Sequence, residues 1–114
     1  MYPSIREYRI EGSIDELMQK VNEDFFPIIS KVQGFLAYYC VDTGNGEVAS
    51  ISIFKDKAGI EESNRLAGTW VKENLASILL GAPEITTGIV PVAKISLIWI
   101  KQATKDYGIN EMDN

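Results

Sequence analysis

Hydrophobic and polar positions follow two different periods along this chain, and the changes of period predict where its elements lie. Residues 4–11, SIREYRIE, alternate as a strand does, with Tyr8 and Ile10 on one side and Ile5 on the other. Gly12 breaks that alternation. We therefore expect a first strand that ends at this glycine.

A helical period begins directly after the glycine. Ser13 and Glu16 have the spacing of a capping box, in which the serine hydroxyl accepts a hydrogen bond from a backbone N–H of the first turn. The apolar residues that follow recur every three or four positions and form one stripe: Ile14, Leu17, Met18, Val21, Phe25, Ile28, Ile29 and Val32. Pro27 is expected to kink or tighten the last turns, and Gly34 to end the helix.

Two alternating runs flank Gly44-Asn45-Gly46 in the stretch FLAYYCVDTGNGEVASISIFK and predict a β-hairpin. A register that pairs Asp42 with Glu47 assigns the side chains to two faces. One face then carries Tyr39 opposite Ser50, Ala37 opposite Ser52 and Phe35 opposite Phe54, and the other carries Cys40 opposite Ala49, Tyr38 opposite Ile51 and Leu36 opposite Ile53. A slip of one residue would exchange Tyr39 for Tyr38.

Neither face of the predicted hairpin is polar, although an antiparallel sheet usually exposes one polar face to solvent. One layer of helices covers one face. A chain of 114 residues has no second layer for the other face, and a partner subunit is the simplest cover. We therefore expect a homodimer through the sheet face.

The remaining pattern predicts a second helix and a last strand. Asp56 is a candidate N-cap for a helix over residues 57–80, which the sequence GAP ends. A strand is expected over residues 85–93, where Pro91 indicates an edge position or a bulge. The next stretch, KISLIWIK, is either a further apolar strand or a short helix, and the pattern favours neither.

This order of elements predicts an α+β fold, the ferredoxin-like βαββαβ sandwich, with one antiparallel sheet and two helices on one face. We expect it to occupy a single domain, residues 1–103, followed by a polar C-terminal tail, residues 104–114.

Composition and charge narrow the classes of function. Sixteen acidic residues against eleven basic ones give a net charge of −5, which argues against a nucleic-acid partner. The longest apolar stretch is too short to span a bilayer, and the N-terminus lacks the apolar core of a signal peptide. Cys40 is the sole cysteine, so no internal disulfide forms and the thiol is expected to be buried and inert. We expect a cytoplasmic protein without a membrane partner.

The chain contains no histidine, which excludes an imidazole base and a histidine metal ligand. Carboxylates alone can bind metals, but no D-x-D-x-D-G loop or shared-face carboxylate constellation is present. We expect neither a metal nor a cofactor.

The predicted second helix carries polar residues on its apolar side. With about 100° per residue, Ser63 and Asn74 fall in the middle of the apolar arc, Asn64 falls toward its edge, and Trp70 lies one turn before Asn74. A buried amide needs a hydrogen-bond partner. Asn74 therefore either bonds a backbone carbonyl or a trapped water, or it lines a pocket.

The hairpin face that carries Tyr39 has small residues beside it. Tyr39, Ser50 and Ser52 would line an aromatic-walled cavity together with the helical pair if this face lies beneath the helices. In the alternative, the bulk of Trp70 and Phe25 fills the space that the serines leave. Periodicity does not separate these two interpretations.

With this order of elements, the chain resembles the antibiotic-biosynthesis-monooxygenase-like group of dimeric α/β-barrel proteins. The stretches that carry the resemblance are VQGFLAYY, GEVASISIFKDKAGIEESNRLAGTWVKENL and PEITTGIVPV, which span most of the chain. The resemblance implies a homodimer whose sheets pack face to face into a dimeric α/β barrel. It also implies a small aromatic ligand between sheet and helices, which some members oxygenate without metal or flavin.

The resemblance also assigns candidate roles. Trp70 matches the helical tryptophan of the group, and Asn64 or Asn74 matches the amide beside the substrate. The catalytic candidates are Asn74, Trp70 and Tyr39, and the substrate-binding candidates are Ser50, Ser52, Ser63 and Asn64. Relatives that degrade haem use an axial histidine, which this chain lacks.

Three functions remain as hypotheses. The first is a cofactor-independent monooxygenase acting on a quinol- or anthrone-like substrate. The second is a non-catalytic ligand-binding or structural homodimer, in which Asn74 is a satisfied core amide. The third is an isomerase or lyase that uses Glu7 and Arg9 as its charged pair.

Overall fold

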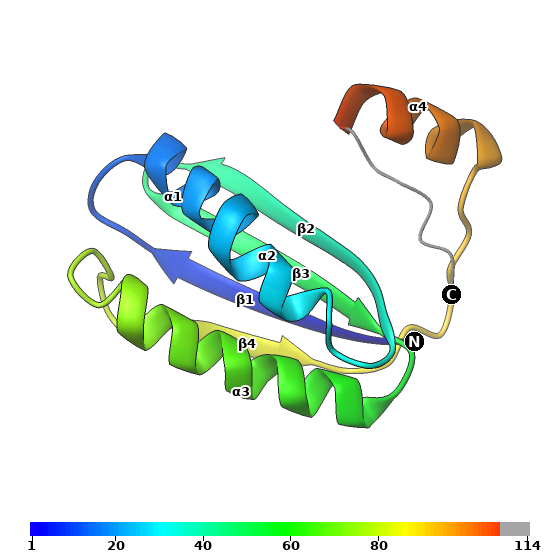
Figure 1. The fold of residues 1–114 in the computed structure, drawn as a ribbon, viewed down its shortest axis with the longest axis horizontal. Coiled ribbons are helices and arrows are strands. Elements are labelled where there is room, and N and C mark those ends of the chain that lie inside the picture. The colour runs from blue at the N-terminus through cyan, green and yellow to red at the C-terminus, as the bar shows by residue number, and fades with distance from the viewer. Residues whose placement is uncertain (108–114) are drawn as a thin grey trace.

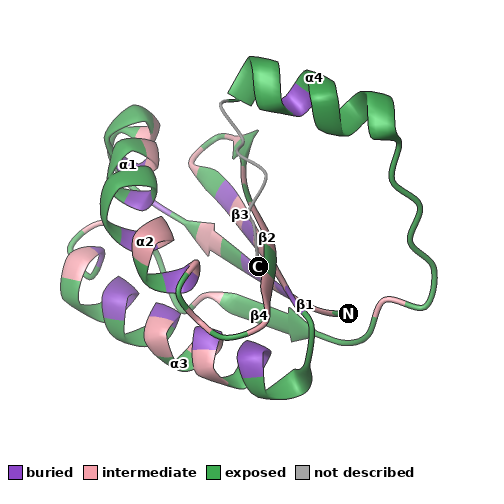
Figure 2. Cartoon of the chain, turned by 45° about the vertical axis from the view of Figure 1, so that its right-hand side comes forward, coloured by how far each residue is buried: buried purple, intermediate pink, exposed green. Residues whose placement is uncertain are grey.

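A four-stranded antiparallel sheet forms the central layer of the structure (Figure 1). The structure is a computed structural model that describes residues 1–107. The strands are β1 (Tyr2–Arg9), β2 (Phe35–Gly44), β3 (Glu47–Phe54) and β4 (Glu84–Thr87), in the spatial order β2-β3-β1-β4. Helices α1 to α3 cover one side of the sheet (Figure 2). This arrangement confirms the α+β ferredoxin-like fold.

The first helical segment changes its type midway. It consists of α1 (Ile14–Lys20), the π-helical turn η1 (Val21–Phe25) and α2 (Phe26–Ile29). The hydroxyl of Ser13 accepts a hydrogen bond from the Glu16 N–H at 3.2 Å, as the capping box predicts. Pro27 lies in the first turn of α2, directly after the π-helical turn, whose wider spacing accommodates the proline ring.

This segment ends earlier than expected. The helix α2 stops at Ile29, with Ser30 as its C-cap, so the prediction that Gly34 ends the helix is wrong. Gly34 has a φ of +87° and instead turns the chain into β2. Its carbonyl accepts a hydrogen bond from the Lys55 N–H at 2.7 Å, which joins the start of β2 to the end of β3.

The register of the hairpin differs by one residue from the predicted one over most of its length. The turn has two residues, Asn45 and Gly46, both with positive φ, so Gly44 pairs with Glu47. The register shifts between Asp42 and Gly44 and again between Phe35 and Ala37. Asp42 therefore pairs with Val48, Cys40 with Ser50, Tyr39 with Ile51 and Tyr38 with Ser52, whereas Phe35 opposite Phe54 is confirmed.

The second half follows the predicted order with shorter elements. Helix α3 (Lys57–Asn74) begins at Asp56, whose Oδ1 accepts a hydrogen bond from the Gly59 N–H at 2.9 Å, which confirms the predicted cap. It ends at Asn74, before the expected residue 80. Strand β4 is limited to four residues, and most of KISLIWIK lies in a helix, α4 (Leu97–Tyr107).

The boundary expected between residues 103 and 104 falls within α4. Residues 108–114 of the predicted tail lie outside the described residues.

The core lies between the sheet and helices α1 to α3. It is formed by Ile10, Leu17, Val21, Phe25, Ile29, Val48, Phe54, Ile60, Ala67, Trp70, Val71 and Leu75. Each large apolar side chain buried there contributes about 1.5–3 kcal/mol. The opposite face of the sheet carries the half-buried Ile5, Ile51 and Ile53 and the exposed Tyr39 and Val41, so neither face is predominantly polar.

Two glycines of α3 provide a matched test of this packing. A Cβ on Gly59 would lie 2.7 Å from Phe54 Cδ1 and 3.0 Å from the Gln33 carbonyl oxygen, whereas a Cβ on Gly68 meets nothing within 4 Å. We expect Gly59→Ala to lower the free energy of unfolding by about 1–3 kcal/mol through overpacking. Gly68→Ala should raise it by about 0.5–1 kcal/mol because alanine favours the helix.

Urea denaturation followed by circular dichroism measures both changes. Equal effects of the two substitutions would contradict the close packing of α3 on β3.

Candidate functional site

Arg6 is the only charged side chain that is buried among the described residues, with an exposed fraction of 3%. It lies on β1, between β3 and β4, and its side chain shares the inner face of the sheet with those of Ser4 and Tyr8. The alternation of this strand places all three beneath α3. A charge taken out of water is costly unless polar groups surround it.

The guanidinium of Arg6 finds its acceptors on both layers. Its Nε donates a hydrogen bond to the Tyr8 hydroxyl at 2.6 Å, and its Nη1 donates to Asn64 Oδ1 at 3.2 Å and to the Asn64 carbonyl at 3.4 Å. Ser4 Oγ donates to the same Oδ1 at 2.7 Å. Asn64 therefore joins the middle of α3 to β1, and these four residues form what we call the Arg6 cluster.

No carboxylate balances this positive charge within residues 1–107. The ion pairs of that region join Arg9 to Glu47 and Arg65 to Glu62, and neither involves Arg6. Tyr8 does not supply a phenolate at neutral pH, because burial raises the pKa of Tyr8 despite the opposing hydrogen bond from Arg6. The Arg6 cluster is thus a buried cation held by neutral groups, an arrangement that favours an anionic ligand atom.

An aromatic hollow adjoins this cluster. Phe25 packs against Trp70 with ring centroids 5.1 Å apart and against Tyr38 at 5.8 Å. The hollow measures about 30 Å³ and is lined by Tyr8, Ile10, Leu17, Val21, Phe25, Tyr38, Cys40, Val48, Ser50, Trp70, Val71 and Leu75. This volume holds roughly one water molecule. Tyr8 belongs to both the hollow and the cluster, so the two adjoin at this residue.

The titratable groups of the hollow keep their protons at neutral pH. Burial raises the pKa of Tyr38, and the neighbouring Cys40 raises it further. Burial also raises the pKa of the Cys40 thiol, although hydrogen bonds from Tyr38 and the Val41 backbone lower it. These groups can therefore donate hydrogen bonds to a ligand but do not supply a strong base.

The structure brings several of the predicted site residues together. Trp70 and Ser50 line the hollow, and Asn64 lies in the Arg6 cluster. Ser52 is buried beside them on β3, and Ser63 is buried with its hydroxyl donating to the Ile60 carbonyl at 2.9 Å.

Asn74 and Tyr39 are placed elsewhere. The amide of Asn74 donates to the Trp70 carbonyl at 2.9 Å, so of the two alternatives it takes the backbone hydrogen bond. Tyr39 is 45% exposed on the outer face of the sheet, so the condition under which it would line the cavity, that its face lies beneath the helices, is not met. The shift between Asp42 and Gly44 reverses the facing of these strand residues, and Tyr38 occupies that place.

The alternation of the first strand already contains a signal for Arg6. The predicted strand places Tyr8 and Ile10 on one side, and period-2 alternation puts Arg6 and Ser4 on that same side. Glu7 and Arg9, the charged residues that the isomerase hypothesis requires inside, are both exposed. The charged pair of that hypothesis is therefore not inside the molecule.

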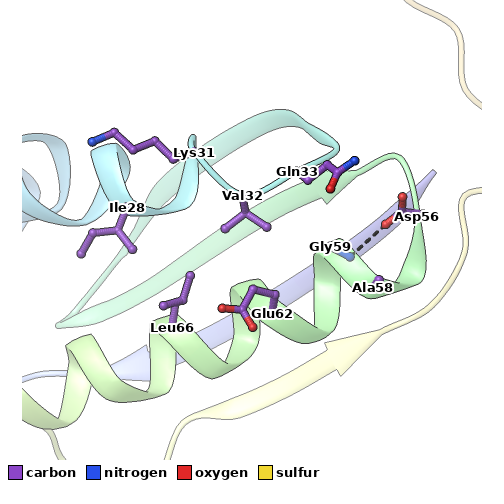
Figure 3. A pocket seen from close by; sticks show the side chains of 9 residues that line it. All are labelled: Ile28, Lys31, Val32, Gln33, Asp56, Ala58, Gly59, Glu62 and Leu66. Atoms are coloured by element: carbon purple, nitrogen blue, oxygen red, sulfur yellow. Dashed lines mark hydrogen bonds between the residues drawn. The ribbon is translucent and has the colours of Figure 1, made fainter.

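A larger hollow than the aromatic one lies elsewhere, between α2 and α3 (Figure 3). It has a volume of about 520 Å³ and is lined by Ile28, Lys31, Val32, Gln33, Asp56, Ala58, Gly59, Glu62 and Leu66. Its two acidic residues already have partners: Asp56 caps α3, and Glu62 binds Arg65 with an Nε–Oε2 distance of 3.0 Å. This open groove lacks a buried polar group directed at a ligand.

Neither a metal site nor a membrane span is found in the described part of the chain. No three acidic residues or cysteines converge there as metal ligands. No helix of residues 1–107 is both long and apolar enough to cross a bilayer.

Comparison with solved structures identifies proteins of the same fold. A monooxygenase from the gene ActVA-Orf6 of Streptomyces coelicolor, in complex with nanaomycin D, superposes with a TM-score of 0.66 and 16% identity over 83% of this chain and 91% of that chain. SnoaB, a cofactor-independent oxygenase from Streptomyces nogalater, gives a TM-score of 0.61 and 12% identity over 84% of this chain and 95% of that chain.

A dimeric ferredoxin-like protein from an uncultured marine organism gives a TM-score of 0.60 and 15% identity over 83% of this chain and 97% of that chain. No family model and no curated protein matches the sequence. At these identities the comparisons confirm the resemblance to antibiotic biosynthesis monooxygenases at the level of the fold.

The raised pKa of Tyr38 predicts a loss of stability in alkali. The unfolded chain ionises this phenol at about pH 10, while the folded chain retains its proton to higher pH. The unfolded state then binds fewer protons, so the free energy of unfolding falls as pH rises above about 10. We expect Tyr38→Phe to make that fall less steep in urea denaturation between about pH 8 and 11. A slope identical to that of the wild type would contradict a buried, protonated Tyr38.

Proposed function

We propose that this protein is a cofactor-independent monooxygenase of the antibiotic-biosynthesis type. Its substrate is a small quinol- or anthrone-like aromatic that binds between the sheet and α3. The observation that carries the proposal is the Arg6 cluster, a buried guanidinium without a carboxylate partner among the described residues, which adjoins an aromatic hollow. The shared fold with the oxygenases from Streptomyces supports the general type of reaction.

The positive charge of the Arg6 cluster favours a substrate that reacts in its deprotonated, anionic form. An ionised phenol or enol has a negative oxygen, which the Arg6 guanidinium stabilises in a site of low dielectric constant. The ionised ring gives one electron to O₂, and the resulting substrate radical and superoxide combine into a C–O bond. Loss of water from that peroxide converts the CH₂ group into a carbonyl, so that CH₂ and O₂ yield C=O and H₂O.

The protein contributes orientation and electrostatics to this reaction. Arg6 binds the substrate oxygen, Asn64 fixes the guanidinium, and Tyr38 donates a hydrogen bond to the oxygen introduced. Trp70 offers a ring face for stacking. Because the hollow holds roughly one water, a substrate has to separate the Phe25 and Trp70 rings to enter.

Arg6→Met tests the function apart from the fold. Methionine removes the buried charge but leaves the Tyr8 hydroxyl and the Asn64 carbonyl without the donor that Arg6 supplies, so we expect thermal unfolding at a lower temperature with an unchanged circular dichroism spectrum. Oxygen uptake with a panel of anthrones and quinols should fall about 100-fold or more, as for a lost oxyanion donor. Arg9→Met is the matched control, because Arg9 is exposed on the same strand, and it should retain full activity.

Oxygen uptake by the wild type no greater than in buffer, across the whole panel, would count against the monooxygenase. Quenching of tryptophan fluorescence by the same compounds, without uptake, would favour the second function, a ligand-binding homodimer.

Alanine substitutions of the two asparagines of α3 distinguish a ligand site at the Arg6 cluster from a ligand site at the C-terminal end of the helix. Asn64→Ala removes the acceptor shared by Arg6 and Ser4, so we expect weaker substrate binding, measured by tryptophan quenching. Asn74→Ala removes only a bond to the Trp70 carbonyl, so we expect a drop in stability of about 1 kcal/mol with binding retained. If Asn74→Ala lost substrate binding and Asn64→Ala retained it, the substrate would bind at the C-terminal end of α3 and not at the Arg6 cluster.

A further inference from the structure

The guanidinium of Arg6 has one donor group that the protein does not use. Its Nε donates to the Tyr8 hydroxyl, and its Nη1 donates to both oxygens of Asn64, but its Nη2 donates to no acceptor among residues 1–107. No side-chain nitrogen or oxygen of that region is both fully buried and unpaired. Nη2 therefore still borders accessible space, although the residue as a whole is 3% exposed.

Two hydroxyl-bearing residues of the aromatic hollow flank Arg6. Tyr8 lies two positions further along β1, on the same face of the strand. Ser50 is buried and lies directly opposite Arg6 in the pairing of β1 with β3. Both residues line the hollow. They therefore form the end of the hollow that lies next to the guanidinium, which we call the polar end.

The polar end offers hydrogen-bond donors to a ligand. The Tyr8 hydroxyl accepts the Arg6 Nε–H at 2.6 Å, so its own proton is directed elsewhere, and it meets no acceptor among residues 1–107. The hydrogen bond from the cation also polarises the Tyr8 O–H group and strengthens it as a donor. The proton of the Ser50 hydroxyl rotates toward an acceptor placed beside it. The polar end thus suits a ligand that only accepts hydrogen bonds.

No negative group of the hollow balances the charge of Arg6. Its lining residues include neither aspartate nor glutamate. Tyr8, Tyr38 and Cys40 are neutral at pH 7, because burial raises the pKa of each. The hollow holds roughly one water molecule, and a water there leaves the buried charge uncompensated. A monovalent anion of similar size neutralises it.

We propose that the protein without substrate binds one small monovalent inorganic anion, a halide such as chloride, at the polar end of the hollow. The anion accepts hydrogen bonds from the hydroxyls of Tyr8 and Ser50 and balances the charge of Arg6. An anionic substrate oxygen has to displace it, so halides compete with the substrate. The bound halide is independent of the monooxygenase reaction, whereas the competition rests on the proposed function.

Bromide is the probe for this site, because it resembles chloride in charge and size and quenches tryptophan fluorescence through its heavy nucleus. Trp70 lines the hollow and is buried, whereas Trp99 is 43% exposed, so Trp99→Phe leaves one buried reporter. Sodium bromide replaces sodium gluconate at constant ionic strength, which leaves charge screening unchanged. We expect quenching of Trp70 that saturates with bromide, since a bound quencher follows a binding curve and a colliding one does not.

Two matched pairs of substitutions in the Trp99→Phe protein assign this quenching to the polar end. Arg6→Met should abolish the saturable part, and Arg9→Met, at an exposed position of the same strand, should retain it. Ser50→Ala preserves the guanidinium and should raise the dissociation constant of bromide about tenfold. Ser63→Ala should leave that constant unchanged, because the Ser63 hydroxyl bonds the Ile60 carbonyl.

Competition between salts tests the site without any change to it. Chloride should reverse the saturable quenching, and sulfate at the same ionic strength should not, because a divalent anion exceeds the single charge of Arg6 and the volume of the hollow. Equal reversal by both salts would indicate a general salt effect and overturn the proposal. Quenching that only increases linearly with bromide would also overturn it, as would saturable quenching of equal strength in Arg6→Met.

Oxygen uptake distinguishes a failure of this inference from a failure of the proposed function. With a compound that the protein oxidises, chloride should raise KM and leave kcat unchanged. A lowered kcat with an unchanged KM would contradict the competition. If no compound is oxidised, the monooxygenase is contradicted, while saturable quenching by bromide still supports the anion site and its absence still overturns it.

Discussion

The burial of one guanidinium constrains much of this structure. Arg6 lies beneath α3 with 3% of its surface exposed, and a charge in that position needs acceptors from every direction. The strand supplies the Tyr8 hydroxyl, and the helix supplies both oxygens of Asn64. Helix and sheet can therefore approach in only one relative position if these bonds are to form.

The same constraint explains why small polar residues surround the cluster. Ser4, Ser50 and Ser52 are buried on the inner face, where most sheets of this size place larger apolar side chains. Their small volume leaves room for the guanidinium, and on the other side the rings of Phe25, Tyr38 and Trp70 fill the space down to a hollow of about 30 Å³. The polar Arg6 cluster and the aromatic hollow thus lie side by side between the sheet and the helices. A ligand with a charged atom on an apolar ring would contact both.

Sequence patterns predicted the order of the elements and both N-caps, because capping and alternation depend on neighbours a few residues apart. The hairpin register depended on finer detail. Asn45 and Gly46 form a two-residue turn, and Thr43 lies where the register then shifts. That shift of one residue exchanges Tyr38 and Tyr39 between the two faces of the sheet. Of the two aromatic residues expected to line the cavity, Tyr39 and Trp70, the tyrosine therefore lies on the other face. The inward facing of Trp70 is predicted correctly, because it depends on neighbours three and four positions away in its own helix and on no pairing between strands.

Phe25 illustrates what a strict four-residue repeat requires of a helix. Leu17, Val21, Phe25 and Ile29 are all buried, although residues four apart drift by about 40° around an α-helix. Three such steps would carry the last side chain about 120° away from the first, out of the core. The π-helical turn over Val21–Phe25 has more residues per turn and takes back part of that drift. The irregular turn is thus a correction of phase, and it keeps Phe25 facing Trp70 in the same layer as Ile29.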